Sequence, residues 1–303
     1  MPSALETDNK GSLMTSATVA AMLVALILII AKFIAWWMSG SVVVLSSLID
    51  SCLDALASFV NMMAVRHALV PADREHRFGH GKAEALAGLV QAIIITGSAC
   101  YIFYEAILHL IEPQPLPAGG VGIVVMLGSI VLTLVLVLYQ RYVIKRTGSV
   151  AVAADSLHYL SDLLSNASVI LALILATWFG LTWADPVFAI GIGIFILASS
   201  RKIFWTSLDI VLDRELPDAD RERIKAIARA HKEVINLHDL KTRSAGTETF
   251  IQFHVELDPA MNISTAHDIT DEVEEEIRAA FPDADIIIHV DPYGIEEPRQ
   301  VFE

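Results

Sequence analysis

Charged residues and cysteine are scarce in this 303-residue chain. Only 18% of the residues are charged and only two are cysteine, whereas 54% are hydrophobic. A typical soluble protein has about 25% charged residues. Cys52 and Cys100 lie in apolar runs, so we predict neither a disulfide framework nor a CxxC metal site. The shortage of charge excludes a soluble enzyme and indicates a protein of the lipid bilayer.

The acidic excess is concentrated at the end of the chain. Residues 1–212 hold 11 Lys/Arg against 13 Asp/Glu, and residues 213–303 hold 10 against 22, so the two parts carry formal charges of −2 and −12. An acidic domain of this kind excludes a nucleic-acid partner, because phosphate recognition needs clustered Lys and Arg. Glu6 and Asp8 stand where a secretory signal would be positively charged, so we expect no cleaved leader.

Six apolar stretches are each long enough to cross a bilayer, which takes about 20 helical residues. Turn-forming residues separate them, including Ser39-Gly40, the proline-rich run 113–117 and Thr147-Gly148. The expected spans are residues 13–38, 41–66, 83–111, 120–143, 150–177 and 186–208. An even number of spans puts both termini on the same side of the membrane.

Lysine and arginine are absent from three connections between these spans, near residues 38–42, 109–120 and 177–186. The basic residues instead follow spans two and four and precede the exit from span six: Arg66, Arg74, Arg77, Lys82, Arg141, Lys145, Arg146, Arg201 and Lys202. Basic loops stay in the cytoplasm. We therefore predict a cytoplasmic segment over 1–12, a membrane domain over 13–212 and a cytoplasmic domain over 213–303.

Four ionisable residues in mid-span indicate a function, since each charge there costs about 2.5–3.5 kcal/mol on the insertion scale. The second span carries Asp50 and Asp54 one helical turn apart, and the fifth carries His158 and Asp162 at the same spacing. Three carboxylates and an imidazole suit tetrahedral zinc. We interpret these four residues as a divalent cation site that can exchange metal for protons.

Further polar residues line the same helical faces. Asp155 lies one turn before His158 and stays outside the expected ligand set. For the hydroxyl and amide side chains of the second span we favour helix–helix hydrogen bonding. These residues are Ser47, Ser51, Ser58 and Asn61.

The loop after the second span contains Asp73, His76 and His80. If the loop coils, these three side chains can bind a second metal ion. They can equally belong to a solvated loop that faces lipid headgroups, and their spacing favours neither interpretation.

The acidic domain alternates helix and strand signals in the order α-β-β-α-β. We expect a helix from about Pro217, strands over 234–243 and 248–257, a helix capped by Ser264 or Thr265, and a strand around 286–288. This order predicts an α+β domain with helices on one face of a small sheet. Alternation along the second strand puts His254 on its polar face.

Five residues of this domain can bind metal: His238, His254, His267, His289 and Asp291. Each histidine alone is an ordinary surface or strand residue. Their concentration in one small domain makes a metal cluster an equal alternative.

Together these motifs resemble the cation diffusion facilitator family. The runs VPADREHRFGHGKAEALA and ADSLHYLSDLLSNA are similar to its bacterial zinc/ferrous-iron efflux branch. The resemblance implies a homodimer in the bacterial inner membrane that exports metal in exchange for protons, with a ferredoxin-like cytoplasmic domain. Zinc is the implied substrate, since position 158 is histidine, and Fe²⁺ or Cd²⁺ should also be accepted. The protein would be a secondary transporter, not an enzyme.

The resemblance also assigns roles to residues. It implies a transport site at Asp50, Asp54, His158 and Asp162, a loop site at Asp73, His76 and His80, and a binuclear site at the domain's dimer interface formed by His238, His254, His267, His289 and Asp291. It further implies a salt-bridge interlock between membrane and cytoplasmic domains that involves Lys82, Asp213 and Arg243. Val290 departs from the glutamine expected beside the binuclear site.

Three other classes of membrane protein remain for comparison. A proton-coupled carrier of organic solutes could use carboxylates in the membrane, but it would not require ligand pairs one helical turn apart on two helices. An intramembrane metalloprotease needs a catalytic base beside zinc, typically in an HExxH motif, and the chain contains no such string. A membrane-anchored metal sensor without transport activity would use the cytoplasmic cluster, but it would not need four ionisable residues in mid-span.

Overall fold

A computed structural model describes residues 4–40, 42–111, 120–181 and 183–295. The chain divides into a helical bundle, residues 9–208, and a second compact unit formed mainly by the residues from 209 onward. The predicted proline-rich turn at 113–117 lies outside the described residues.

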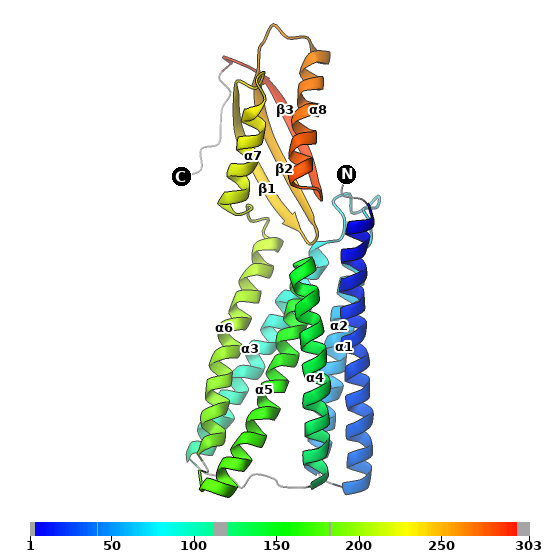
Figure 1. The fold of residues 1–303 in the computed structure, drawn as a ribbon, viewed down its shortest axis with the longest axis vertical. Coiled ribbons are helices and arrows are strands. Elements are labelled where there is room, and N and C mark those ends of the chain that lie inside the picture. The colour runs from blue at the N-terminus through cyan, green and yellow to red at the C-terminus, as the bar shows by residue number, and fades with distance from the viewer. Residues whose placement is uncertain (1–3, 41, 112–119, 182, 296–303) are drawn as a thin grey trace. The chain divides into compact units, whose positions relative to one another are not determined.

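Six long helices form the bundle, and successive helices run in opposite directions (Figure 1). They are α1 (Ala4–Ser39), α2 (Val42–Ala68), α3 (Lys82–Ile111), α4 (Gly120–Thr147), α5 (Val150–Phe179) and α6 (Ala184–Val211). All six are long and apolar enough to cross a membrane. The prediction of six spans is therefore confirmed, although α1 begins at Ala4, well before the span expected from residue 13.

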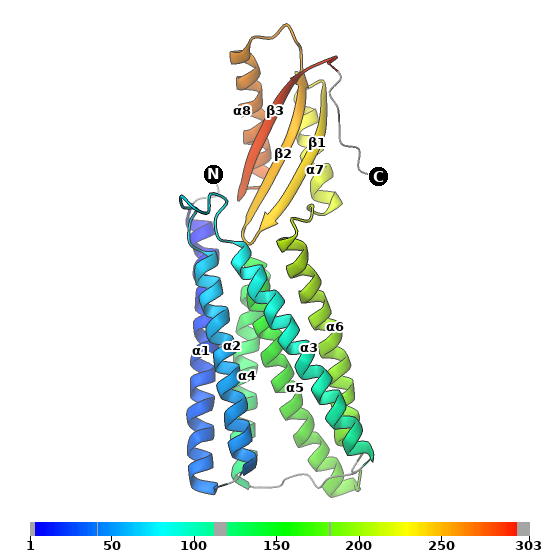
Figure 2. The same ribbon diagram turned by 180° about the vertical axis from the view of Figure 1, so that it is seen from behind.

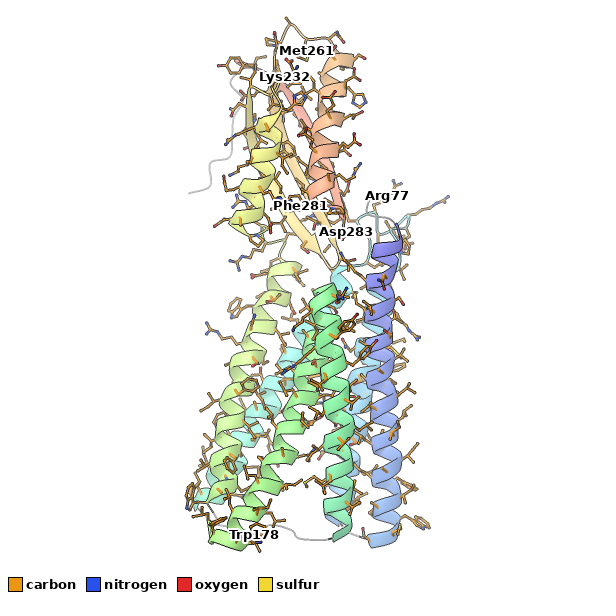
Figure 3. All side chains as sticks on the ribbon, in the orientation of Figure 1. Arg77, Trp178, Lys232, Met261, Phe281 and Asp283 are labelled. Atoms are coloured by element: carbon orange, nitrogen blue, oxygen red, sulfur yellow. The ribbon has the colours of Figure 1, made fainter. Side chains whose placement is uncertain are left out.

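The bundle exposes its large apolar side chains and buries polar ones. Leu23, Ile30 and Leu53 are each more than half exposed, whereas Ser58 and Gln140 are almost completely buried. This is the reverse of a soluble protein, and it is favourable only when lipid covers the outer surface. Arg77 and Trp178 mark opposite ends of the bundle (Figure 3).

A short turn joins α4 to α5 and makes them antiparallel neighbours. Gly148 has a φ of +69°, a left-handed conformation that glycine adopts without strain, and its N–H donates to Ile144 O at 2.8 Å. The Ser149 hydroxyl then accepts the Val152 N–H at 3.1 Å and caps α5. The turn therefore fixes the start of α5 at Val150, and His158 and Asp162 lie within the first four turns of this helix.

The second unit contains two helices and a three-stranded sheet. Its elements are α7 (Asp218–Ala230), β1 (Asn236–Ala245), β2 (Glu248–Leu257), α8 (Ile263–Ala280) and β3 (Ala284–Pro292). The strand order is β1-β2-β3, with β1 antiparallel and β3 parallel to β2. Both helices lie on one side of the sheet (Figure 2). The predicted α+β order is therefore confirmed.

The core of this unit forms between the helices and one face of the sheet. Ile251 and Phe253 of β2 pack with Ile224 of α7 and Ile277 of α8, and each is at most 1% exposed. Alternation puts the intervening residues of each strand on the other, open face. The predicted cap of α8 is wrong: Asn262 Oδ1 accepts the Thr265 N–H at 3.0 Å, so the cap precedes both Ser264 and Thr265.

Candidate metal-binding sites

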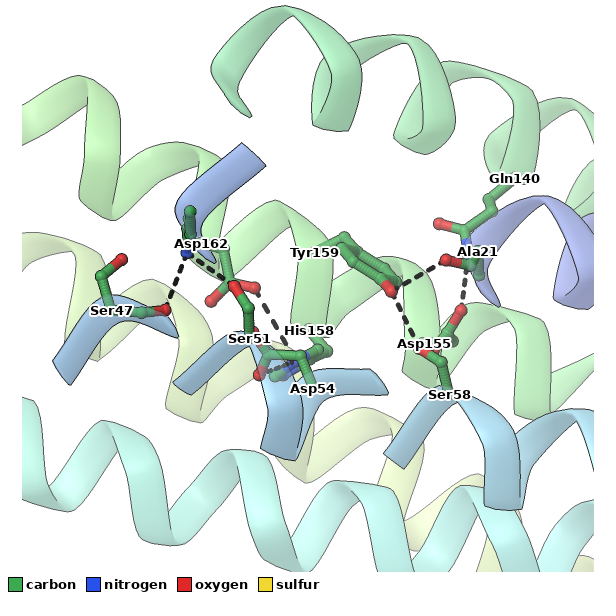
Figure 4. Close-up of polar contacts among 11 residues, drawn as sticks. Ala21, Ser47, Ser51, Asp54, Ser58, Gln140, Asp155, His158, Tyr159 and Asp162 are labelled. Atoms are coloured by element: carbon green, nitrogen blue, oxygen red, sulfur yellow. Dashed lines mark hydrogen bonds and ion pairs between the residues drawn. The ribbon is translucent and has the colours of Figure 1, made fainter. Parts of the chain in front are cut away.

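Three of the four ionisable residues predicted in mid-span come together between α2 and α5. Nε2 of His158 lies 2.9 Å from Asp54 Oδ1 and 3.7 Å from Asp162 Oδ2 (Figure 4). Ligand atoms of all three residues lie within 4.8 Å of one another. Two carboxylates and an imidazole at this spacing are a ligand set for zinc or a similar transition metal. We call these three residues the bundle cluster.

Asp50 does not belong to this compact group, although it lies one turn before Asp54. Its side chain lines the same cavity of about 140 Å³, together with Asp54 and Asp162. A cavity of this size holds several water molecules. Asp50 therefore borders the cavity that the carboxylates of the cluster also line, but it is not one of the three closely spaced residues.

Lys32 of α1 lines this cavity as well, and the sequence interpretation gave it no role. Its ammonium donates to Ser51 Oγ at 2.6 Å and to Ser47 O at 3.1 Å. The cavity thus contains a built-in cation beside the carboxylates. The signal was available, because a single lysine inside a long apolar run is costly and therefore functional by default.

Asp155 is buried in a hydrogen-bond network beside the cluster. Its two carboxylate oxygens accept from Ser58 Oγ at 3.1 Å and from Gln140 Nε2 at 2.7 Å. The Tyr159 hydroxyl lies 2.9 Å from Ser58 Oγ and donates to Ala21 O at 3.2 Å. This network joins α1, α2, α4 and α5 (Figure 4). It supports the interpretation of Ser58 as a helix–helix hydrogen-bonding group and places Asp155 outside the bundle cluster.

The loop between α2 and α3 coils and brings Asp73, His76 and His80 together. Ligand atoms of the three residues lie within 4.8 Å of one another. Asp73 Oδ1 accepts the backbone N–H groups of His76 at 2.6 Å and of Glu75 at 2.8 Å. These bonds to backbone amides, chiefly the one from His76, hold the pKa of the Asp73 carboxyl below its usual value. Asp73 is therefore anionic at neutral pH and available as a ligand.

Strand register aligns three histidines across the sheet of the second unit. His238 of β1 pairs with His254 of β2, which pairs with His289 of β3. All three occupy the open face, because His254 alternates with the core residues Phe253 and Val255. Neighbouring imidazole centroids are 5.1 Å and 4.5 Å apart. The predicted polar face of β2 thus carries a histidine row.

Asp291 connects the three histidines through both of its carboxylate oxygens. Oδ2 lies 2.8 Å from His254 Nδ1 and 3.2 Å from His238 Nε2, and Oδ1 lies 3.1 Å from His289 Nε2. Nδ1 of His238 is buried and lies 3.3 Å from Glu256 Oε1, so a second carboxylate borders the histidine row. We call His238, His254, His289 and Asp291 the sheet cluster.

A bulge in β1 follows directly after His238. The register shifts between His238 and Lys241, and Asp239 has a φ of +51°, which aspartate tolerates better than most residues. The bulge changes the direction of β1 next to the histidine row. Val290 pairs with Val255 and so lies on the helix side of β3, away from the row.

The remaining predicted residues are not gathered into these clusters. His267 lies on α8 with its side chain 72% exposed and 3.6 Å from Asp271. Since α8 covers the face opposite the histidine row, His267 does not join the sheet cluster of its own chain. Arg243 Nη1 lies 3.3 Å from Asp213 Oδ1 within the second unit, whereas the predicted link from Lys82 to this pair stays a prediction.

The fold and these clusters define a class of protein: a six-helix membrane protein with a metal-ligating group between its helices and a second one on a separate α+β domain. A sequence model described as the cation efflux transmembrane domain matches residues 18–212. Another, described as the cytoplasmic domain of cation efflux proteins, matches residues 216–293. The chain belongs to the cation diffusion facilitator family.

Curated relatives match nearly the whole chain. The cation-efflux pump FieF of Cronobacter sakazakii is 47% identical over 285 residues, covering 94% of this chain and 95% of the relative. FieF of Klebsiella pneumoniae is 46% identical over 293 residues, covering 97% of each. The metal-bound C-terminal domain of the CzcD transporter from Thermotoga maritima is 31% identical, with a TM-score of 0.25 over 26% of this chain and 93% of that domain.

Proposed function

We propose that this protein exports divalent zinc from the bacterial cytoplasm in exchange for protons. The observation that carries the proposal is the bundle cluster, in which ligand atoms from α2 and α5 lie within 4.8 Å of one another beside a polar cavity. One imidazole and two carboxylates bind Zn²⁺, and they also accept Fe²⁺ and Cd²⁺. Relatives at 46–47% identity are called cation-efflux pumps, which supports the same direction here.

Asp50 supplies the fourth ligand in this proposal. It shares a helical face with Asp54 and lines the same cavity. A site that closes around the ion only when Asp50 moves in, and opens when Asp50 moves away, can bind and release metal in turn. Such a site suits alternating access, in which zinc enters from one side and leaves on the other.

Proton exchange follows from the atoms that the cluster uses. Nε2 of His158 can only donate to the Asp54 carboxylate 2.9 Å away, so without metal it carries a proton. The same nitrogen must lose that proton to bind zinc. Each zinc ion therefore displaces a proton on entry and is displaced by one on exit. Two charges leaving a negative cytoplasm cost about 4.6 kcal/mol per 100 mV; one entering proton halves this electrical cost, and a second one would cancel it.

The sheet cluster serves in this proposal as a binuclear zinc site that regulates transport or stabilises a homodimer. Asp291 directs one oxygen toward His238 and His254 and the other toward His289, which suits a carboxylate that bridges two ions. His267 of the same chain lies on the opposite side of the sheet, so its predicted role requires that a second copy supplies it. Metal binding would also reduce the repulsion between two acidic domains, each with a formal charge of −12.

Three further features complete the proposal. Asp73, His76 and His80 form a separate loop metal site. Lys82 interlocks with Asp213 and Arg243. Both termini lie in the cytoplasm, since the lysine- and arginine-rich connections follow α2 and α4. The protein resides in the inner membrane.

Flux measurements in proteoliposomes test the proposal. Vesicles that are acidic inside and contain a zinc-sensitive dye should take up zinc through the wild-type protein, because protons leave down their gradient. Uptake should stop when an ionophore collapses the pH gradient, and parallel runs with Cd²⁺ and anaerobic Fe²⁺ should rank the substrates. Zinc that binds to a folded protein but never crosses, with either direction of gradient, would contradict export and favour the metal-sensor alternative.

A further inference from the structure

His67 contacts His80 of the loop group formed by Asp73, His76 and His80, although the sequence interpretation assigned it no role. It belongs to the last turn of α2, and its ring centroid is 4.6 Å from that of His80 in an edge-to-face arrangement. The His76 centroid is likewise 4.5 Å from that of His80. Three imidazoles and the Asp73 carboxylate therefore meet at one end of the bundle.

We propose that His67 is the fourth ligand of a closed, tetrahedral metal site formed with Asp73, His76 and His80. This inference rests on the proposed loop metal site and deepens it. The three residues of the loop offer one carboxylate and two imidazoles, which leaves one position of a four-coordinate ion open. His67, whose ring contacts that of His80, is the residue that we assign to this position.

The hydrogen bonds of His80 prepare the site for metal. Nδ1 of His80 lies 3.2 Å from the carbonyl oxygen of Val70, which can only accept, so Nδ1 carries the proton. Nε2 is then left with a free lone pair, and it lies 3.5 Å from Asp73 Oδ2. A backbone carbonyl that fixes the tautomer of a ligating histidine in this way is the usual outer partner in zinc sites.

His67 can reach the ion with a small movement. Its own backbone is fixed, because its carbonyl oxygen accepts the Val70 N–H at 3.1 Å. Its side chain is exposed, so a rotation costs little packing. Zinc–nitrogen bonds of about 2.1 Å put two ligand nitrogens about 3.4 Å apart in a tetrahedron, a separation that two rings 4.6 Å apart can adopt by turning.

A set of three nitrogens and one oxygen selects zinc over the hard cations Mg²⁺ and Ca²⁺, which prefer oxygen ligands. Four protein ligands also leave no position for water, which is the mark of a structural zinc site. The loop ion would then fasten the end of α2 to the start of α3. It would not be a stage on the path of transported metal.

The test uses the full chain with the other two clusters removed by Asp54→Ala, Asp162→Ala, His238→Ala and Asp291→Ala. Zinc content and affinity are measured by competition with a chromophoric chelator, and Co²⁺ replaces zinc for visible spectroscopy. We expect one tight zinc ion per chain and the intense absorption of tetrahedral cobalt. Adding His67→Ala should weaken zinc binding at least about 10-fold and reduce the cobalt absorption, and His67→Gln should do the same.

The matched control is His109→Ala, which removes a histidine near the end of α3 that contacts Glu105 at 3.9 Å and belongs to no cluster. It should leave zinc affinity and the cobalt spectrum unchanged. Unchanged affinity and spectrum in His67→Ala and His67→Gln would overturn the role of His67 while the three-residue loop site stands. A background chain that elutes as a folded protein but binds no zinc would overturn the loop site itself.

Discussion

In the bundle, Asp54, His158 and Asp162 come from two helices, and the two aspartates line a cavity together with Lys32. In the α+β domain, three histidines come from neighbouring strands and converge on one buried aspartate, 6% exposed. Helices in contact can turn or shift by a fraction of a turn without losing backbone hydrogen bonds, whereas strands in a ladder cannot. The proposed function therefore assigns two tasks to similar ligands: exchange of metal between helices, and retention of metal on a sheet.

The largest expected effect is the loss of zinc transport when a residue of the bundle cluster is replaced. Asp54→Ala removes a ligand that contacts His158 and should abolish zinc flux in proteoliposomes, with at least a 10- to 100-fold loss of zinc affinity at the bundle cluster. Asp185→Asn is the matched control, since it neutralises a carboxylate of α6 outside the cluster, and its flux should match wild type. Flux that persists in Asp54→Ala would remove the bundle cluster from the transport path.

The next effect concerns the bridging carboxylate of the sheet cluster. Asp291→Ala should release both zinc ions of the proposed binuclear site, because its two oxygens face different histidines, whereas His289→Ala should release one. Zinc per chain measured by atomic absorption after gel filtration distinguishes the variants. Equal losses in the two variants would argue for a single ion and against the bridge. Zinc flux that persists in Asp291→Ala would mean that transport by the bundle cluster does not require metal at the sheet cluster.

A third prediction concerns the effect of Lys32 on zinc affinity at the bundle cluster. Its ammonium lies in the cavity with the carboxylates and competes electrostatically with an incoming cation. Lys32→Gln should therefore bind zinc about 10-fold more tightly at the bundle cluster, a change of about 1.4 kcal/mol, and release it more slowly. Lys32→Arg keeps the charge and should remain near wild type in calorimetric titration. Weaker binding in Lys32→Gln would mean that the lysine positions ligands and does not compete with metal.

The smallest prediction concerns an acidic group of the sheet outside its cluster. Burial, and then the nearby Asp285 and Asp283, raise the pKa of Glu248. A folded-state pKa above the unfolded value means that the charged form costs stability, and the cost appears as the pH rises through the folded value. Glu248→Gln should therefore stabilise the domain by about 0.5 kcal/mol at pH 7, with no gain below about pH 4.

Hydrogen exchange of the β2 amides in the full chain measures this effect. Glu276→Gln, on the exposed side of α8, serves as the control and should change nothing. If Glu248→Gln lowered the protection of β2 at neutral pH, the charge of Glu248 would be stabilising and the repulsion argument would be wrong.

Features with a strong local period could be predicted from the sequence. Six apolar runs separated by turn residues became six helices, and alternation along β2 put His254 on the open face. Spacing of four residues on one helix correctly brought His158 next to Asp162. In these cases the backbone geometry of one element decides the outcome, so residues near in sequence contain the information.

Contacts that depend on the rotation of one helix against another could not be predicted. The spans are apolar on nearly all sides, so the sequence does not state which face of α4 presents Gln140 to Asp155, or that Lys32 of α1 shares a cavity with Asp50. For the same reason His67 and His80, thirteen residues apart, gave no sign of their contact.

The exchange rate of zinc at each cluster tests the central claim most directly. One chain keeps only the bundle cluster (His76→Ala, His80→Ala, His238→Ala, Asp291→Ala), and another keeps only the sheet cluster (Asp54→Ala, Asp162→Ala, His76→Ala, His80→Ala). Both are loaded with radioactive zinc and chased with unlabelled zinc. We predict that the bundle cluster loses its label at least about 10-fold faster than the sheet cluster, since its ligands come from movable helices and face Lys32. Equal rates, or faster loss from the sheet cluster, would contradict the division between exchange and retention.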